Sequence, residues 1–310
     1  METTRCITLE SFCEAFDRST KELPELLKKT HESINTNWRM PTLEESEEYI
    51  LTMLKRTYAT RDSRDEEVNR EAFEKGWSEN LQLAKSNGIC AENLRPRYFR
   101  ESKFFRFAKK IIIPENPNLE YDLFTLSRLL VFTRFLSDFD EIYEFGCGSC
   151  GNVHLLSQTY PDKSYVGLDW TEAAVEMAQR LGKETGMNVS GRLFNFLRPD
   201  ESVTLSPKRA VLTIHALEQI GDNFGNWIEY LLKEKPGIVI NYEPLVELYD
   251  PDNLYDALAI KYCEMRGYLN GYLTTIRRLA QEGKVEILKE VRPCIGGIWH
   301  EASLIVWRPI

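Results

Sequence analysis

The fold is decided by the stretch EIYEFGCGSCGN, which runs from Glu141 to Asn152. Its first residues have strand character, and three glycines follow at Gly146, Gly148 and Gly151. Together they predict a strand, a tight turn and a helix that begins at Asn152. Glycine suits such a turn because it adopts backbone angles that a Cβ penalises and because a ligand can approach its bare backbone. The stretch is therefore typical of a loop that cradles a cofactor.

Glu144 narrows the class of cofactor. Folds that bind dinucleotides usually have an apolar residue two places before the first glycine, because a carboxylate there would repel the pyrophosphate. A cationic ligand would be attracted instead. S-adenosylmethionine carries a sulfonium and an ammonium group and no phosphate, so an acidic residue at this position favours it over NAD.

The segment EFGCG, Glu144 to Gly148, resembles motif I of the class I methyltransferases that use S-adenosylmethionine. One departure is Cys150, because many members carry a third glycine one place before Gly151. The resemblance covers about residues 120 to 310 and implies a sheet with an antiparallel last strand, whereas a plain dinucleotide-binding sheet more often stays parallel. It also implies that the motif supplies four cofactor-binding residues, namely Glu144, Gly146, Cys147 and Gly148.

The composition is that of a globular chain of 310 residues, long enough for two compact units. The 39 Lys and Arg against 48 Asp and Glu give a net charge of −9, and the main basic block is Arg95 to Arg106, so we expect no nucleic acid partner. The sequence shows no signal peptide and no apolar run of about 18 residues. We therefore expect a cytoplasmic protein with no membrane partner, for which a homodimer is compatible with the sequence.

Seven cysteines, an odd number without regular spacing, indicate free thiols in a reducing compartment. Cys147 and Cys150 form a CxxC, but both lie inside the glycine turn, which disfavours a redox role. A zinc site would need a second pair of ligands, and Cys263 and Cys294 stand alone. We therefore expect no metal.

The first 118 residues are expected to form a helical region. Helices are predicted near Ser11 to Phe16 and Lys21 to Asn35, and after two capping boxes formed by Thr42 with Glu45 and by Ser63 with Glu66. Asn87-Gly88 provides a stop for the last of them.

Basic and aromatic residues alternate between Asn93 and Ile113. One interpretation is a linker whose aromatic side chains pack on the next domain. The other is a lid segment that contacts the cofactor carboxylate or an acidic substrate group, with Arg97, Tyr98 and Arg100 as candidates. We expect residues 1–118 to close over the acceptor, because a displacement site needs water excluded.

Residues 119–310 alternate strands and helices regularly, which predicts an α/β fold with a seven-stranded, mostly parallel, doubly wound sheet. Five strands are predicted near 142–146, 164–169, 189–194, 209–215 and 237–242. Helices are predicted at 121–137, 152–160, 171–186 and 223–235, and two closing strands at 284–292 and 301–308.

Polar residues at the carboxyl ends of the second and third strands are candidates for the cofactor's nucleoside. Asp169 can accept both ribose hydroxyls and Trp170 can pack on adenine, although Asp169 could instead cap the helix that begins at Thr171. Asn195, followed by Phe196, stands where the family often carries an acidic residue that faces the adenine amino group. The alternative for Asn195 is a turn.

Three residues at the same sheet edge are catalytic candidates. His215 follows the fourth strand, resembles the family's motif IV and could contact the cofactor or act as a general base, although a structural histidine is the commoner case. Glu243 ends the fifth strand and could hold the substrate or cap backbone amides. His300 precedes the last strand. Tyrosines of the insertion between the fifth and sixth strands, among them Tyr262 and Tyr268, could form a substrate wall or belong to the core.

These observations predict an S-adenosylmethionine-dependent methyltransferase that moves a methyl group to an oxygen or nitrogen of a small molecule. A cofactor-binding protein without catalysis, used for regulation or assembly, is one alternative. An NAD-dependent oxidoreductase is another, and Glu144 and the closing strand pair both oppose it.

Overall fold

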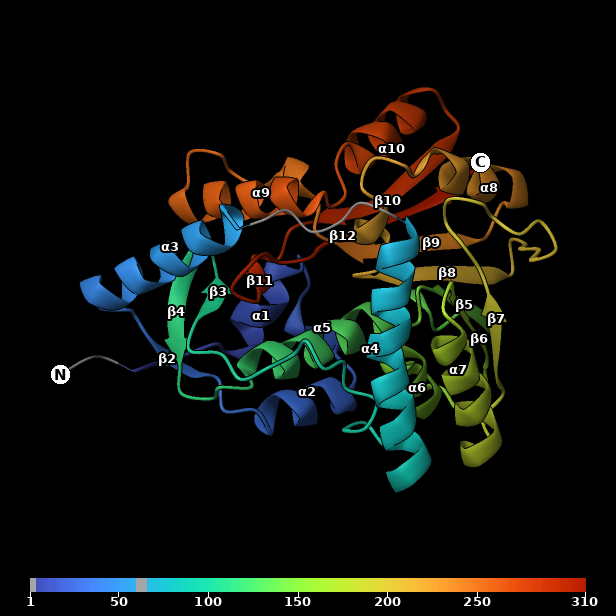
Figure 1. The fold of residues 1–310 in the computed structure, drawn as a ribbon, viewed down its shortest axis with the longest axis horizontal. Helices are drawn as coiled ribbons and strands as arrows, with labels where there is room; N and C mark the ends of the chain where they lie inside the picture. The colour runs from blue at the N-terminus through green and yellow to red at the C-terminus, as the bar shows by residue number, and fades with distance from the viewer. Residues whose placement is uncertain (1–3, 60–65) are drawn as a thin grey trace.

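The structure, a computed structural model, describes residues 4–59 and 66–310 (Figure 1). Its larger sheet consists of β5 (Glu141–Phe145), β6 (Ser164–Asp169), β7 (Val189–Leu193), β8 (Arg209–Ile214), β9 (Ile238–Glu243), β10 (Val285–Val291) and β12 (Ser303–Pro309). The strand order is β10-β12-β9-β8-β5-β6-β7. β12 is antiparallel to both of its neighbours, and the other neighbouring pairs are parallel. The predicted α/β fold, including its antiparallel last strand, is confirmed.

Helices cover both faces of this sheet, as its buried strands require. One core contains the apolar sides of α5 (Leu119–Phe135), α6 (Gly151–Thr159) and α7 (Glu172–Thr185). The core of the other face is formed with α8 (Gly225–Glu234) and α10 (Tyr272–Gln281). All six residues of β9 are buried, which reflects this double covering. The carboxyl ends of the parallel strands therefore meet at one edge, where the site is expected.

A second, smaller sheet corrects the expectation of an all-helical N-terminal region. It consists of β1 (Arg5–Cys6), β2 (Asn37–Arg39), β4 (Lys110–Pro114), β3 (Phe105–Phe107) and β11 (Ile295–Gly296), in that order. The turn between β3 and β4 has positive φ angles at Ala108 and Lys109, residue types that do not signal a hairpin. The division into residues 1–118 and 119–310 stays a prediction, and one strand of this sheet comes from the second part.

The N-terminal helices are α1 (Leu9–Ala15), the short η1 (Thr20–Glu22), α2 (Glu25–Glu32), α3 (Leu43–Thr57) and α4 (Glu66–Asn87). The capping box of Thr42 with Glu45 is present at the start of α3. Ser63 of the second predicted box lies outside the described residues. α4 ends as predicted, with Gly88 at a φ of +83° directly after Asn87. Within the part of the chain that the structure describes, no helix is both long and apolar enough to cross a bilayer.

Two N-terminal helices lie against the second half of the chain (Figure 1). α3 lies beside α9 (Leu254–Arg266), and α4 packs along α7. Glu74 of α4 accepts hydrogen bonds from the backbone N–H groups of Glu172, at 2.8 Å, and Ala173, at 3.1 Å. These are the first two residues of α7, so a side chain of one helix caps the other.

Four buried charges connect the N-terminal hairpin to the last strands. Arg106 of β3 contacts Asp256 of α9 at 2.8 Å and also pairs with Glu301. Arg292, which follows β10, pairs with the same two carboxylates. The side chains are 2%, 0%, 1% and 6% exposed for Arg106, Asp256, Glu301 and Arg292. Two positive and two negative charges therefore balance in a largely buried place. We call these four residues the buried ion cluster.

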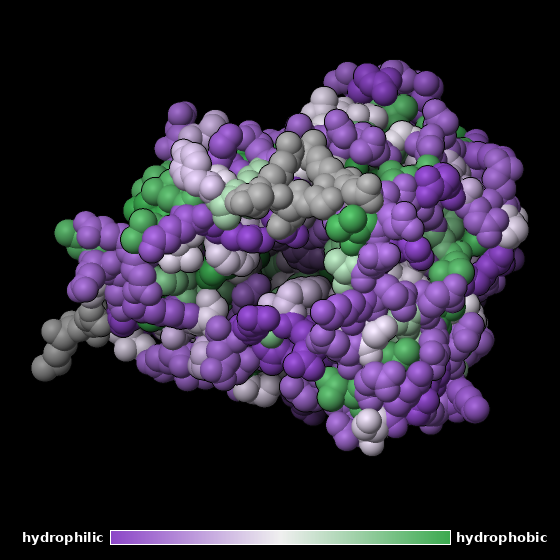
Figure 2. Space-filling view, in the orientation of Figure 1, coloured by the Kyte–Doolittle hydropathy of each residue, from purple (hydrophilic) through white to green (hydrophobic). Residues whose placement is uncertain are grey.

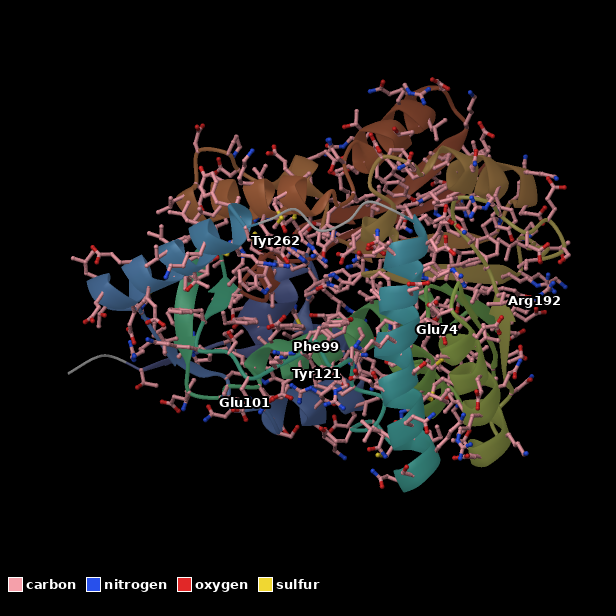
Figure 3. All side chains as sticks on the ribbon, viewed as in Figure 1. Glu74, Phe99, Glu101, Tyr121, Arg192 and Tyr262 are labelled. Carbon is pink, nitrogen blue, oxygen red and sulfur yellow. The ribbon has the colours of Figure 1, made fainter. Side chains whose placement is uncertain are left out.

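We expect Arg106→Met to lower the free energy of unfolding by about 3 to 5 kcal/mol, because it leaves a buried carboxylate charge uncompensated. Urea denaturation measures this. The matched control is Arg192→Met on β7, whose partner Asp200 is 3.7 Å away and exposed (Figure 3). We expect Arg192→Met to change the free energy of unfolding by no more than about 0.5 kcal/mol. Equal losses in the two variants would show that the cluster does not hold the sheets together.

Candidate functional site

The glycine loop follows β5 and has the tight backbone that the sequence predicts. Gly146 and Gly148 have φ angles of +76° and +51°. A Cβ on Gly146 would lie 2.3 Å from the Cβ of Ala216, and one on Gly148 would lie 2.7 Å from the Trp77 ring. Both positions therefore require glycine for space as well as for conformation. The backbone at this loop forms a cradle that a side chain would fill.

Glu144 lies below this loop and is 1% exposed. Its Oε1 accepts a hydrogen bond of 2.5 Å from Asn152, and its Oε2 is buried without a hydrogen-bond partner. Burial raises the pKa of Glu144 to about 8, against the opposing effects of Asn152 and Arg128. At neutral pH the carboxyl group is therefore mostly protonated, and a cation near Oε2 would ionise it.

Arg128 of α5 is a candidate that sequence reasoning missed. Its side chain is buried, donates to Asn152 at 2.8 Å and to Thr125 at 2.7 Å, and leaves Nε without a partner. The guanidinium lies 4.4 Å from the centre of the Phe124 ring. Arg128 and Glu144 thus place one cationic and one acidic group beside the same asparagine. Nothing in the helical pattern of α5 marks Arg128, because its importance comes from tertiary contacts.

Asp169 lies at the end of β6 and connects the loop to the next helix. Its Oδ2 accepts from the backbone N–H of Gly148 at 3.0 Å, and its Oδ1 accepts from the backbone and hydroxyl of Thr171. Burial raises the pKa of Asp169 against these hydrogen bonds. The first amides of α7 are capped by Glu74, so Asp169 does not cap the helix alone. Its side chain also lines a cavity.

This small cavity, of about 60 Å³, lies above the glycine loop. Its walls include all the nucleoside-binding candidates: Asp169, Trp170, Asn195 and Phe196. Phe73 and Trp77 of α4 cover it from the other side, with Phe73 6.1 Å from Trp170 between ring centres. α4 therefore forms a roof over the loop, and no local feature of its sequence indicated this.

Asn195 is held in a turn, the alternative that the sequence left open. Its side-chain oxygen accepts from the backbone N–H of Leu197 at 2.8 Å, and its amide group donates to Glu66 of α4 at 2.9 Å. Phe196 packs on Trp227, with 5.0 Å between ring centres. Both residues still line the small cavity, Asn195 as a link to α4 and Phe196 as part of the wall.

His215 follows β8 at the point where the small cavity meets a much larger one. Its φ of +51° is rare outside glycine, and such strain is found preferentially at functional sites. Its Nδ1 lies 3.1 Å from Oε2 of Glu218 in the short helix η2 (Leu217–Ile220). Burial alone would lower the pKa of His215, but Glu218, Glu243 and Glu120 together raise it above its ordinary value.

Glu243 caps backbone amides, the alternative that the sequence left open, and its catalytic role stays a prediction. It is fully buried, and its carboxylate accepts from the backbone N–H groups of Ala216, Leu217 and Glu218 at 3.1 to 3.3 Å. It lines neither the small nor the large cavity. The backbone-capping alternative therefore holds, and Glu243 positions the turn that carries His215.

The large cavity has a volume of about 600 Å³ and lies between the N-terminal region and the sheet edge. Figure 2 shows a hollow in this face of the molecule. Tyr262 of α9 and Phe99 lie on opposite sides of it in Figure 3, and both line the cavity. Further ring side chains in its wall are Tyr98, Phe124, Tyr242, Tyr268, Trp299 and His300. Two tyrosines of the insertion, Tyr262 and Tyr268, thus contribute to a cavity wall.

His300 is brought to His215 by the chain between β11 and β12, with 5.7 Å between ring centres. Burial lowers the pKa of His300 to about 4, and its Nδ1 is buried without a hydrogen-bond partner. Tyr98 and Arg100 line the large cavity, as the lid interpretation expects. Arg97 does not line it and lies 3.5 Å from Glu79 of α4 instead.

No family model matches the chain, and no curated protein sequence matches it. Many solved structures with a similar fold are class I S-adenosylmethionine-dependent methyltransferases. The methyltransferase domain of bacterial CtHen1-CN is 16% identical with a TM-score of 0.44, over 60% of this chain and 97% of that one. A geranyl diphosphate methyltransferase in complex with GPP and sinefungin is 13% identical with a TM-score of 0.43, over 78% and 98% of the two chains.

A third structure is that of a sarcosine dimethylglycine methyltransferase, described as putative, from Galdieria sulphuraria. It is 13% identical with a TM-score of 0.43, over 62% of this chain and 86% of that one. Identities this low describe the fold alone, so the cofactor and acceptor must be argued from this chain's own residues.

The contact between α4 and α7 yields a prediction. Glu74→Gln keeps the side-chain length but removes the charge that caps α7, so we expect a loss of about 1 kcal/mol in the free energy of unfolding and faster hydrogen exchange in α4. Glu79→Gln is the matched control, because Glu79 lies on the same helix and is 51% exposed. If both variants exchange α4 amides at the wild-type rate, Glu74 does not hold the roof in place.

Proposed function

We propose that the protein is an S-adenosylmethionine-dependent methyltransferase that methylates an oxygen or nitrogen atom of a small molecule. One observation carries this proposal: His215 and Gln219 line both the small cavity above the glycine loop and the large aromatic cavity. A methyl donor held over the loop and an acceptor held in the large cavity would therefore meet beside His215.

The residues around the loop fit S-adenosylmethionine. The orphaned Oε2 of Glu144 suits its ammonium group, and Nε of Arg128 suits its carboxylate. Asp169 and Trp170 would hold ribose and adenine. Cofactor and drug-sized ligands usually occupy about 300 to 1,000 Å³, so Phe73 and Trp77 of α4 must move outward to enlarge the small cavity.

The cofactor supplies an activated methyl group on a sulfonium, which is transferred in one in-line displacement. Alignment is the protein's main contribution to such a step, and in the best intramolecular cases it supplies about 7 to 11 kcal/mol. Glu243 fixes the turn that carries His215, and α4 and the segment of Tyr98 and Arg100 exclude water from the meeting point. Residues 1–118 thereby act as a lid.

His215 is the candidate for taking the acceptor's proton. Nδ1 is engaged by Glu218, which leaves Nε2 as the basic nitrogen, and the carboxylate stabilises the imidazolium that results. An amine acceptor that binds unprotonated needs no base. A hydroxyl acceptor needs His215 as its base or another group that assists its deprotonation.

The large cavity supports a small acceptor with a flat or apolar portion. Its volume of about 600 Å³ lies in the usual range for small-molecule sites, and aromatic rings provide much of its wall. Burial raises the pKa of Glu120, which lines the same cavity, to about 7. Arg100 and Arg266 in the wall supply positive charge, so the acceptor is expected to carry polar groups as well.

Proton release tests the role of Glu144. Its pKa of about 8 in the free protein should fall when an ammonium binds, so binding at pH 7 should release a proton. Below pH 8, the affinity should increase by up to about tenfold for each unit by which the pH is raised. Isothermal titration of S-adenosylmethionine in buffers of different ionisation enthalpy measures this release. It should disappear in Glu144→Gln and persist in Glu141→Gln, which changes the exposed acid of the same strand.

Turnover tests the proposal as a whole. Incubation with S-adenosylmethionine and fractionated metabolite extracts should yield the demethylated cofactor and a methylated product detected by mass spectrometry. Asp169→Ala should weaken cofactor binding by about 1.5 to 3 kcal/mol, because hydrogen bonds to a charged group are worth about that much. Tight binding without product in any fraction would favour a regulatory protein, and preferential binding of NADH would favour an oxidoreductase.

A further inference from the structure

Three potential metal ligands converge on the wall of the large cavity. His215, Glu218 and His300 each offer a ligand atom, and these atoms all lie within 4.8 Å of one another. All three residues line the cavity. His215 and Glu218 come from the turn after β8, whereas His300 comes from the chain before β12, so only the tertiary fold brings them together.

The distances match the needs of a metal ion. Zinc binds histidine nitrogen and carboxylate oxygen at about 2.0 to 2.2 Å, which separates neighbouring ligand atoms by about 3 to 3.5 Å. Nδ1 of His215 and Oε2 of Glu218 are 3.1 Å apart. The third ligand atom, from His300, lies within 4.8 Å of the other two.

One of the three residues, His300, also has a buried ring nitrogen without a hydrogen-bond partner. Nδ1 of His300 is buried without a hydrogen-bond partner, and an unmet buried polar group is unfavourable unless something binds it. The side chain of Glu218 is 6% exposed and that of His215 is 19% exposed.

The ligands are held on rigid supports, as a metal site requires. Glu243 binds three backbone amides of the turn that carries His215 and Glu218. Glu301, the neighbour of His300, belongs to the buried ion cluster. Oε1 of Glu218 accepts from Gln219 at 2.8 Å, which orients its carboxylate.

We propose that His215, Glu218 and His300 bind one divalent transition-metal ion that faces the large cavity. Two imidazoles and one carboxylate suit zinc, iron, manganese or cobalt better than magnesium or calcium, which prefer oxygen ligands. Three protein ligands leave coordination positions open toward the cavity, as in catalytic rather than structural sites.

The role of this ion rests on the proposed function, whereas its binding does not. A hydroxyl of the acceptor would occupy an open position, where the ion lowers its pKa and its proton leaves to solvent. The oxygen then takes the methyl group as the carbon–sulfur bond breaks, and the thioether departs. In the metal-bound protein His215 is a ligand through Nδ1, and the ion takes over the activation of the acceptor that the metal-free protein would leave to His215 as the base.

Metal titration of the full-length protein, stripped with a chelator and free of S-adenosylmethionine, tests the proposal. We expect one Zn²⁺ or Co²⁺ per chain and much weaker binding of Mg²⁺. His300→Phe keeps the ring and Glu218→Gln keeps the hydrogen bonding, and each should raise the Kd for Zn²⁺ by about 100-fold or more. The control is His31→Gln, which should leave the Kd for Zn²⁺ unchanged. His31 lies far from the three ligands in sequence and bonds the carbonyl of Ile7. Thermal melting establishes that each variant is folded.

Thiols are the main competing explanation, because Sγ of Cys147 and Sγ of Cys150 lie 3.7 Å apart. Zinc binding that survives both His300→Phe and Glu218→Gln but is lost in Cys150→Ser overturns the proposal, as does a stoichiometry of zero in the wild type. A protein that binds S-adenosylmethionine and methylates its acceptor equally well with and without chelator would refute the metal's role and leave the proposed function intact. Metal binding without any methyl transfer would support the metal site and refute the proposed function.

Discussion

The buried ion cluster is the constraint on which the shape of the site depends. Burying one charge costs several kcal/mol, so Arg106 and Arg292 can be buried only if Asp256 and Glu301 meet them. These residues come from β3, from the chain directly after β10, from α9 and from the chain before β12. Their pairing therefore fixes the chain on both sides of His300 against the N-terminal hairpin. The large cavity lies between these parts, and neither half of the chain builds it alone.

The larger sheet could be predicted because each of its signals is local. The glycines after β5 and the alternation of strands and helices can be recognised from short stretches of the sequence. The smaller sheet could not, because its strands are two to five residues long and β11 joins β3 from the far end of the chain. Its hairpin turn at Ala108 and Lys109 has left-handed backbone without glycine or asparagine. These strands form because segments far apart in the sequence pair with one another.

The same distinction holds for the site. Residues at or near the carboxyl ends of parallel strands, such as Asp169, Phe196 and His215, lie at the expected edge because sheet topology places them there. Position in sequence does not settle where a side chain points, and Glu243 turned away to cap three amides. Helical residues such as Trp77 and Arg128 gain their importance only from packing. A helix pattern shows which face is apolar but not which loop it covers.

Glu144 shows how burial changes an argument made from sequence. The preference for a cation over a phosphate assumed a charged carboxylate, yet burial raises its pKa to about 8. A neutral acid would not repel a phosphate strongly, so repulsion alone does not select the cofactor. Ionising it at pH 7 costs only about 1.4 kcal/mol, because the pKa lies about one unit away. An ammonium group beside the orphaned Oε2 gains more than this at low dielectric, and Arg128 assists by favouring the ionised form. In the function that we propose, selectivity for a cationic cofactor would therefore arise from a charge that the ligand itself induces.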